Sequence, residues 1–97
     1  MRRKEPMKDI VKTETRNAEG YEYKYYLLVS KSARVASFKL PLYSIKIEMK
    51  GNGQEFQHEL SDIFADVGKA VTFFDEIVEG LVSPSELPFI LEDKIMV

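Results

Sequence analysis

The stretch YSIKIEMKGNGQEFQHEL, residues 43–60, decides the fold of this chain. In residues 43–50 every second side chain is apolar, which is the pattern of a strand with one buried face. The Gly-Asn-Gly link at residues 51–53 suits a hairpin turn, because glycine readily adopts positive φ. Residues 54–60 then predict the returning strand. The side chains expected on the buried faces of these two strands are Tyr43, Ile45, Ile47, Met49, Phe56, His58 and Leu60.

A second hairpin is predicted upstream of this stretch. Residues 21–30, YEYKYYLLVS, alternate strongly, and residues 9–16, DIVKTETR, alternate more weakly before the turn sequence Asn-Ala-Glu-Gly. The tyrosine stripe of residues 21–25 continues into the aliphatic residues of the same face, so we expect it in the core rather than in a ligand cage. Residues 31–42, KSARVASFKLPL, fit a loop, an extra edge strand or an extension of the following strand.

Downstream of the second hairpin the apolar period changes to that of a helix. Residues 66–82 have apolar side chains at i, i+3, i+4 and i+7, and Asp66 is a suitable N-cap. The sequence Ser83-Pro84-Ser85-Glu86 is a capping box that predicts the start of a short second helix, with Leu87, Ile90 and Leu91 on its apolar side. Strands followed by helices predict an α+β fold, an antiparallel sheet of about four strands followed by two C-terminal helices packed on one face. We expect one domain over residues 9–97, with residues 1–8 as a flexible tail.

The composition fits a small folded domain. Of the 97 residues, 44% are hydrophobic and 31% are charged, and there is no cysteine, which suits a reducing compartment. The charged N-terminus is not followed by an apolar run, and no apolar stretch is long enough to span a membrane. We therefore expect a cytoplasmic protein with no membrane partner. Residues 1–50 carry 12 Lys/Arg and 6 Asp/Glu, whereas residues 51–97 carry 2 and 10, so the two halves differ in charge.

Several short motifs together resemble a known family. They are YKYYLL at residues 23–28, YSIKIE at 43–48, Asp-Ile at 62–63, LVSP at 81–84 and LED at 91–93. The resemblance covers roughly residues 9–94 and is to a small uncharacterised family of unknown function from clostridia-like Firmicutes. It implies a bacterial, cytoplasmic protein. It implies no activity and no functional residues.

The sequence offers little catalytic chemistry. No serine stands in a G-x-S-x-G elbow, and His58 is the only histidine. Its apolar strand neighbours predict a partly buried, structural role, and one histidine without cysteine does not make a usual zinc site. Asp62 and Asp66 could hold a hard cation, but Asp66 is explained more simply as a helix cap. The prediction is a non-enzymatic protein with no catalytic residue, no cofactor and no metal site, and an unrecognised enzyme is the second alternative.

An apolar patch opposite the helices is the best indication of function. By strand parity it combines Tyr26, Leu28, Phe38, Leu40 and Leu42. Such a patch predicts a protein-interaction module that binds a protein partner or a second copy in a homodimer. A bulge at Pro41 would instead shift the parity and return part of the patch to the core.

The alternative function is weak binding of single-stranded nucleic acid. The same sheet face would carry Lys24, Tyr26, Lys46 and Lys50, as in some RNA-binding sheets. Glutamates alternate with these lysines, and the pI of about 5.4 is low for a nucleic-acid-binding domain, so both argue against nucleic acid as the partner.

Overall fold

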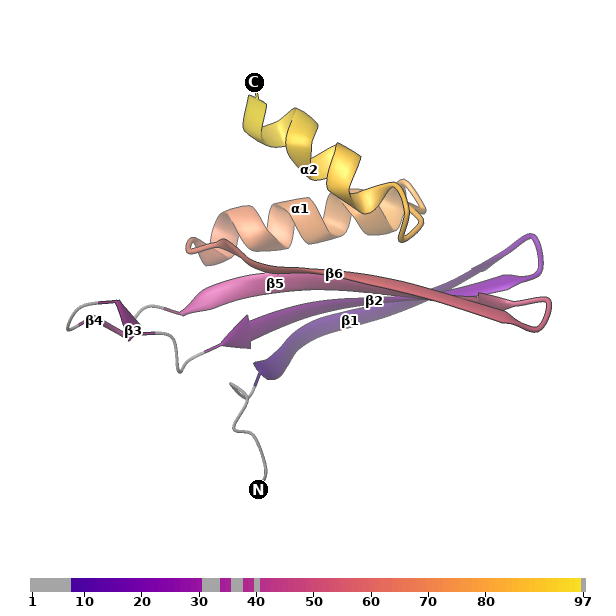
Figure 1. The fold of residues 1–97 in the computed structure, drawn as a ribbon, viewed down its shortest axis with the longest axis horizontal. Coiled ribbons are helices and arrows are strands. Elements are labelled where there is room, and N and C mark those ends of the chain that lie inside the picture. Colours follow the sequence, from indigo (N-terminus) through magenta and orange to yellow (C-terminus); the bar gives the residue numbers. More distant parts are fainter. Residues whose placement is uncertain (1–7, 31–33, 36–37, 40, 97) are drawn as a thin grey trace.

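Four long antiparallel strands form one sheet, and two helices follow on one side of it (Figure 1). The computed structural model describes residues 8–30, 34–35, 38–39 and 41–96, with side chains at 8–30 and 41–92. The predicted α+β class is confirmed. The elements are β1 (Lys8–Ala18), β2 (Tyr21–Ser30), β3 (Arg34–Val35), β4 (Phe38–Lys39), β5 (Leu42–Gly51), β6 (Gln54–Phe64), α1 (Val67–Glu79) and α2 (Leu87–Met96).

The sheet has the order β1-β2-β5-β6, with every neighbouring pair antiparallel. The predicted tail of residues 1–8 lies outside the described residues except for Lys8, which already belongs to β1. The open question of residues 31–42 has a mixed answer. Leu42 extends the following strand. Strands β3 and β4 pair only with each other, in a small hairpin within the connection from β2 to β5.

Both long hairpins close with two-residue turns in which both residues have positive φ. Glu19 and Gly20 (φ 52° and 84°) join β1 to β2, and Asn52 and Gly53 (φ 52° and 73°) join β5 to β6. This is the geometry of type I′ turns, whose twist matches that of the flanking strands. The link predicted over residues 51–53 is therefore one residue shorter, because Gly51 still pairs within β5. A Cβ on Gly51 would lie 2.4 Å from the carbonyl oxygen of Gly20, so the two turns pack tightly together.

Helix α1 begins where the sequence predicts but ends earlier than predicted. The Asp66 carboxylate accepts hydrogen bonds from the backbone N–H groups of Gly68 (2.7 Å) and Lys69 (3.3 Å), which confirms the predicted cap. The helix ends at Glu79 rather than at residue 82, because Leu81 adopts φ 53°. The Val82 N–H then donates to the Ile77 carbonyl (3.0 Å), as in a Schellman motif.

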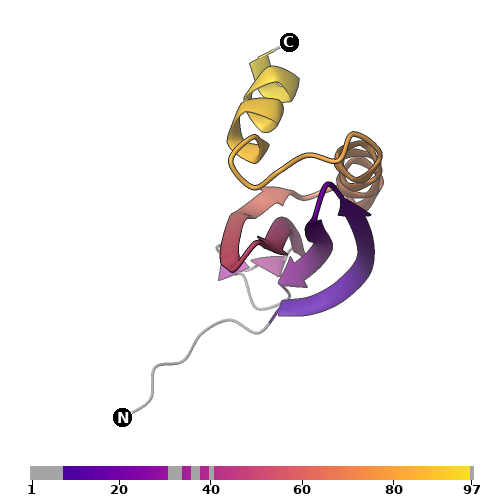
Figure 2. The ribbon, with the colours of Figure 1, turned by 90° about the vertical axis from the view of Figure 1, so that its right-hand side faces the viewer.

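The capping box before α2 is confirmed in one of its two bonds. The Glu86 carboxylate accepts a hydrogen bond from the Ser83 N–H at 3.0 Å. One turn precedes the first residue of α2, Leu87, which is fully buried. Helix α2 lies on the same side of the sheet as α1 and points away from the sheet (Figure 1), and in the end-on view it stands to one side of α1 (Figure 2).

The core lies between the sheet and α1, which packs over β2, β5 and β6. The predicted core position of the tyrosine stripe is confirmed for Tyr25, which is fully buried, and for Tyr23, whose ring stacks on it with centroids 6.3 Å apart, whereas Tyr21 is half-buried. The Tyr25 hydroxyl donates a hydrogen bond to the Val82 carbonyl at 2.9 Å, so the sheet is tied to the link between the helices. Burial of each large apolar side chain contributes about 1.5–3 kcal/mol. The fully buried large side chains are Tyr25, Leu27, Ile45, Ile47, Phe73, Phe74, Ile77 and Leu87.

The sheet is strongly curved, as the end-on view shows (Figure 2). On the face opposite α1, the Lys8 ammonium reaches from β1 to the Glu59 carboxylate and the Ser61 hydroxyl on β6. On a flat sheet these two edge strands would lie about 14 Å apart, three spacings of about 4.8 Å, too far for one ion pair. This face is therefore concave near its β1–β6 contact.

A bulge in β6 contributes to this curvature. Tyr43 and Ile45 are two positions apart in β5, whereas their partners in β6, Phe64 and Leu60, are four positions apart. Strand β6 therefore holds two extra residues at this point. Asp62 lies in the bulge at φ 55°, and its N–H donates to the Ser44 hydroxyl at 2.9 Å. This pairing carries the strand, predicted to end at residue 60, on to Phe64.

Candidate functional site

The patch predicted from strand parity is only partly accessible. Leu28 is 9% exposed and Leu42 is half-buried, so the chain itself covers much of their surface. Tyr26 is half-buried, and its hydroxyl donates to the Glu48 carboxylate at 3.1 Å. Leu40 lies outside the described residues, and for Phe38 only the backbone, in β4, is described. The described members do not form a continuous exposed apolar surface.

The lysines on this sheet face are matched by acids. Lys46 pairs with Glu48 at 3.3 Å, and its ammonium also lies 5.8 Å from the centre of the Tyr26 ring. Lys24 stands directly across the strand pair from Glu48. Partial burial, together with the hydrogen bond and charge of Glu48, raises the pKa of Tyr26. A negatively charged strand of nucleic acid would therefore meet lysines that stand beside a carboxylate, which lowers the positive charge of this face.

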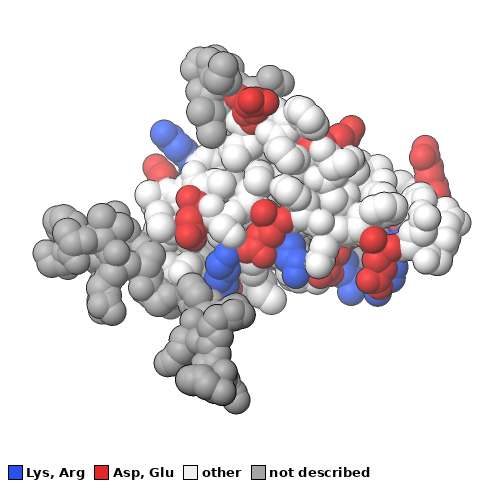
Figure 3. Space-filling view, in the orientation of Figure 1, with Lys and Arg blue, Asp and Glu red and all other residues white. Residues whose placement is uncertain are grey.

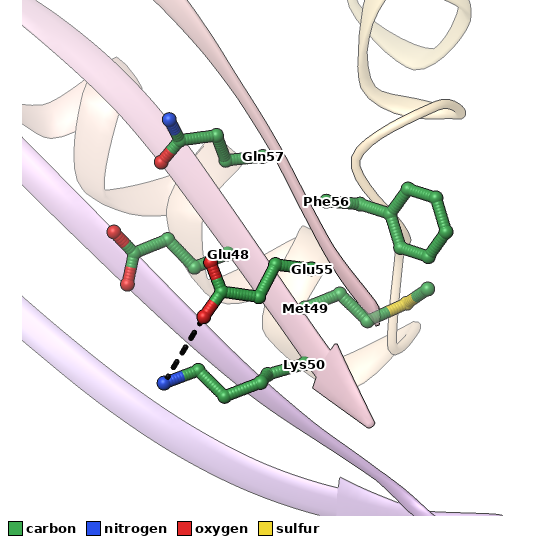
Figure 4. A pocket seen from close by; sticks show the side chains of 6 residues that line it. All are labelled: Glu48, Met49, Lys50, Glu55, Phe56 and Gln57. Carbon is green, nitrogen blue, oxygen red and sulfur yellow. Dashed lines mark ion pairs between the residues drawn. The ribbon is translucent and has the colours of Figure 1, made fainter. Parts of the chain in front are cut away.

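The tip of the β5–β6 hairpin has two chemically different sides (Figure 4). Met49 and Phe56 are cross-strand partners on one side, and Phe56 is 45% exposed. On the other side Lys50 and Glu55 form an ion pair at 3.6 Å. The hollow that these residues line measures about 230 Å³, and it offers one aromatic contact and no catalytic pair.

The prediction that His58 is partly buried is wrong. His58 pairs with Ile47 and shares its face of the sheet, as parity requires, yet it is exposed. The reason is that β6 is an edge strand, and α1 leaves the part of β6 nearest the hairpin uncovered. Among the described residues, no three His, Cys, Asp or Glu side chains lie close enough together to hold a metal ion.

Both edges of the sheet carry features that oppose pairing with another strand. In β1 the register shifts between Ile10 and Lys12, and the Lys12 side chain turns to the helix side. There its ammonium donates to Asp75 of α1 at 2.9 Å and lies 5.6 Å from the centre of the Phe74 ring. Bulges and inward-facing charges are common devices that protect edge strands. The bulge in β6 acts in the same way on the opposite edge.

An open apolar surface lies between the two helices. A groove of about 550 Å³ separates α1 from α2, and the Phe89 side chain on its α2 wall is 68% exposed. Apolar side chains form the walls, and two glutamates lie among them. The residues that line this α1–α2 groove are Glu76, Ile77, Gly80, Val82, Glu86, Phe89 and Ile90.

Sequence reasoning missed Phe89, although a signal was present. Leu87, Phe89, Ile90 and Leu91 are four apolar residues within five positions, more than one face of a helix can bury. The prediction placed three of them on the apolar side and left Phe89 out. Leu87 is buried and Leu91 is half-buried, whereas Phe89 is largely exposed.

A family model described as a family of unknown function (DUF6514) matches residues 4–97. The chain belongs to this family. No curated protein and no solved structure matches the chain. The predicted resemblance to an uncharacterised family is thus confirmed, whereas an origin in clostridia-like Firmicutes stays a prediction.

DUF6514 carries no assigned activity, so function rests on the surfaces of the chain itself. Of these surfaces, the α1–α2 groove is the one lined by Phe89, the most exposed large apolar side chain among the described residues. No helix in the described part of this DUF6514 member combines the length and apolar character needed to cross a membrane.

Proposed function

We propose that this protein is a small non-enzymatic protein-binding module whose binding surface is the α1–α2 groove. The observation that carries the proposal is the exposure of Phe89, 68% of whose surface faces solvent beside the apolar wall of α1. Burial of such a side chain contributes about 1.5–3 kcal/mol, which favours a partner that covers it.

The build of the groove supports a protein partner. An aromatic side chain beside an apolar depression is typical of the few residues that dominate protein interfaces. Two neighbouring helices also offer the surface that amphipathic helices commonly occupy. The partner is another protein or, as the sequence patch first indicated, a second copy of this chain.

Crosslinking from position 89 tests this proposal. Phe89 is replaced by a photoreactive phenylalanine analogue, p-benzoylphenylalanine, in the cells that make the protein, and the cells are irradiated. We expect a discrete covalent adduct, whose mass distinguishes a second copy from a different protein. The same analogue at Thr15, an exposed residue of β1 on the opposite sheet face, is the matched control and should give no such adduct.

The absence of an adduct at position 89, while circular dichroism shows a folded protein, would contradict the proposed function. An equal set of adducts from positions 89 and 15 would do the same, because it would indicate random collisions.

A further inference from the structure

We propose that the α1–α2 groove takes a cationic amphipathic segment of a partner protein, with apolar side chains along one face and Lys or Arg beside them. This inference rests on the proposed function and adds the chemistry of the partner. It is carried by the charge of the helical layer around the groove.

The helical layer is strongly acidic. Residues 66–92 contain six Asp/Glu and a single lysine, Lys69, and one of the six, Asp75, is paired with Lys12 of β1. Figure 3 shows the helical part of one face in white and red apart from blue at its left end, while most of the blue lies over the sheet. Two of the carboxylates, Glu76 and Glu86, line the groove itself, and Glu79 and Glu92 are exposed nearby.

These carboxylates select the sign of the partner. A segment that buries Phe89 brings its own flanking side chains close to Glu76 and Glu86. At such short range opposite charges attract and like charges repel, and the apolar surroundings weaken the screening by water. Lys or Arg beside the apolar contacts would therefore strengthen binding, whereas Asp or Glu would weaken it.

The same charges oppose a second copy as the occupant. In a two-fold dimer the same surface meets itself, so Glu76 and Glu86 of one copy would approach the same residues of the other. Like-charge contacts of this kind suppress wrong partners. The groove is therefore better suited to a cationic protein than to itself.

The dimensions of α2 bound the length of the segment. Helix α2 spans 10 residues, which corresponds to about 15 Å at 1.5 Å per residue. A partner helix of about three turns matches this length, with apolar residues at i, i+3 or i+4, and i+7.

Two synthetic helical peptides test the inference with the complete chain. Both have the same three-turn leucine face, and their remaining positions are lysine in one and glutamate in the other. Fluorescence anisotropy at low salt should show the lysine peptide binding at least about tenfold more tightly. Its advantage should shrink between about 0.05 and 0.5 M salt, because salt screens charges at the rim.

Variants locate the binding. Phe89→Ser, at an exposed position, should weaken binding of the lysine peptide about tenfold or more. Glu76→Lys should weaken it several-fold and favour the glutamate peptide. Glu79→Lys makes the same charge change on the same helix outside the groove lining, and its smaller effect is the control. Circular dichroism checks that each variant is folded.

The remaining outcomes distinguish a failure of this inference from a failure of the proposed function. Equal binding of both peptides, lost in Phe89→Ser, would overturn the charge preference and leave a protein-binding groove. Crosslinking at position 89 to a second copy, with neither peptide bound, would also overturn the inference alone. Lysine-peptide binding that none of the variants changes would overturn it as nonspecific. The absence of any adduct at position 89 would remove the proposed function itself.

Discussion

At the scale of single residues, Tyr25 is a buried side chain that joins the sheet to the helical layer. Its ring is fully buried in the core, and its hydroxyl donates to the Val82 carbonyl at 2.9 Å. Burial is the main cause that raises the pKa of Tyr25 far above its ordinary value, with a smaller contribution from Tyr23. The hydroxyl therefore stays protonated in the folded protein at pH values where an unfolded chain loses the proton.

This difference predicts loss of stability in alkali. Because the pKa of Tyr25 is higher in the folded than in the unfolded state, its contribution is complete below the unfolded pKa of about 10 and declines as pH rises above it. Tyr25→Phe should lower the free energy of unfolding at pH 7 by about 1 kcal/mol, because the Val82 carbonyl loses its partner. It should also make that free energy fall less steeply between pH 9 and 11.

Urea unfolding followed by circular dichroism at several pH values measures both effects. Tyrosinate absorbance, recorded in parallel, should show the last wild-type tyrosine ionising only as the chain unfolds. Identical pH slopes for the wild type and Tyr25→Phe would contradict this account.

At the same scale, residue patterns predicted the helix caps correctly but not the exposure of His58. Asp66 and Glu86 act through bonds to backbone groups two or three positions away, so their role is encoded locally. The exposure of His58 depends instead on which strands α1 covers, and strand parity carries no information on that. The exposure of Phe89 was not predicted for the same reason, because it depends on the direction of α2 relative to α1.

At the scale of elements, the sequence predicted the strands and helices but not all of their ends. Alternation found β2 with its observed bounds, because both of its faces are clearly patterned. It ended the last strand at residue 60, because the bulge beyond it breaks alternation and is held by Ser44, a residue of a different strand. It carried the first helix too far, because the left-handed residue that ends it is Leu81, where a glycine would be the usual signal.

The bulge in β6 should depend on one hydroxyl. Ser44 is fully buried, and its side chain accepts the hydrogen bond of the Asp62 N–H. Ser44→Ala leaves this N–H without its partner, so the free energy of unfolding should fall by about 1–3 kcal/mol. Ser85→Ala, the same substitution at an exposed position, should change it by less than about 0.5 kcal/mol.

Chemical denaturation of the two variants measures the difference. An equal effect of both substitutions would mean that the Ser44 hydroxyl does not hold the bulge.

At the scale of the whole molecule, the fold class could be predicted because four strands precede both helices. An antiparallel sheet with helices on one face is the common solution for that order. The binding surface could not be predicted in the same way, because it arises where two helices meet rather than within one pattern. Of the predicted patch, Leu28 is nearly buried, and strand parity alone could not show how far the rest of the chain covers it.

The two helices should differ in local stability. Helix α1 is covered on one side by the sheet, with Phe73, Phe74 and Ile77 buried, whereas the fully buried residue of the described part of α2 is Leu87, at its start. Amide hydrogen exchange should therefore be about 100-fold or more faster in α2 after Leu91 than in the centre of α1. Binding of the lysine peptide should slow the exchange of α2.

Exchange measured by mass spectrometry on peptides from each helix gives this comparison. Equal protection of α1 and α2 would indicate that the two helices open together, which would contradict a weakly held α2.

The order of the elements also has a consequence in time. All four long strands leave the ribosome before α1, so the apolar sheet face stays uncovered until the chain from Phe64 to Val82 has been made. At about 5–20 residues per second, this delay is on the order of seconds. The Tyr25–Val82 bond, between residues 57 positions apart, closes only at the end of that interval. A nascent chain with an open apolar sheet is a substrate for chaperones that hold aggregation-prone intermediates. The charge of Lys12, on the helix side of β1, reduces the apolar area exposed during this interval.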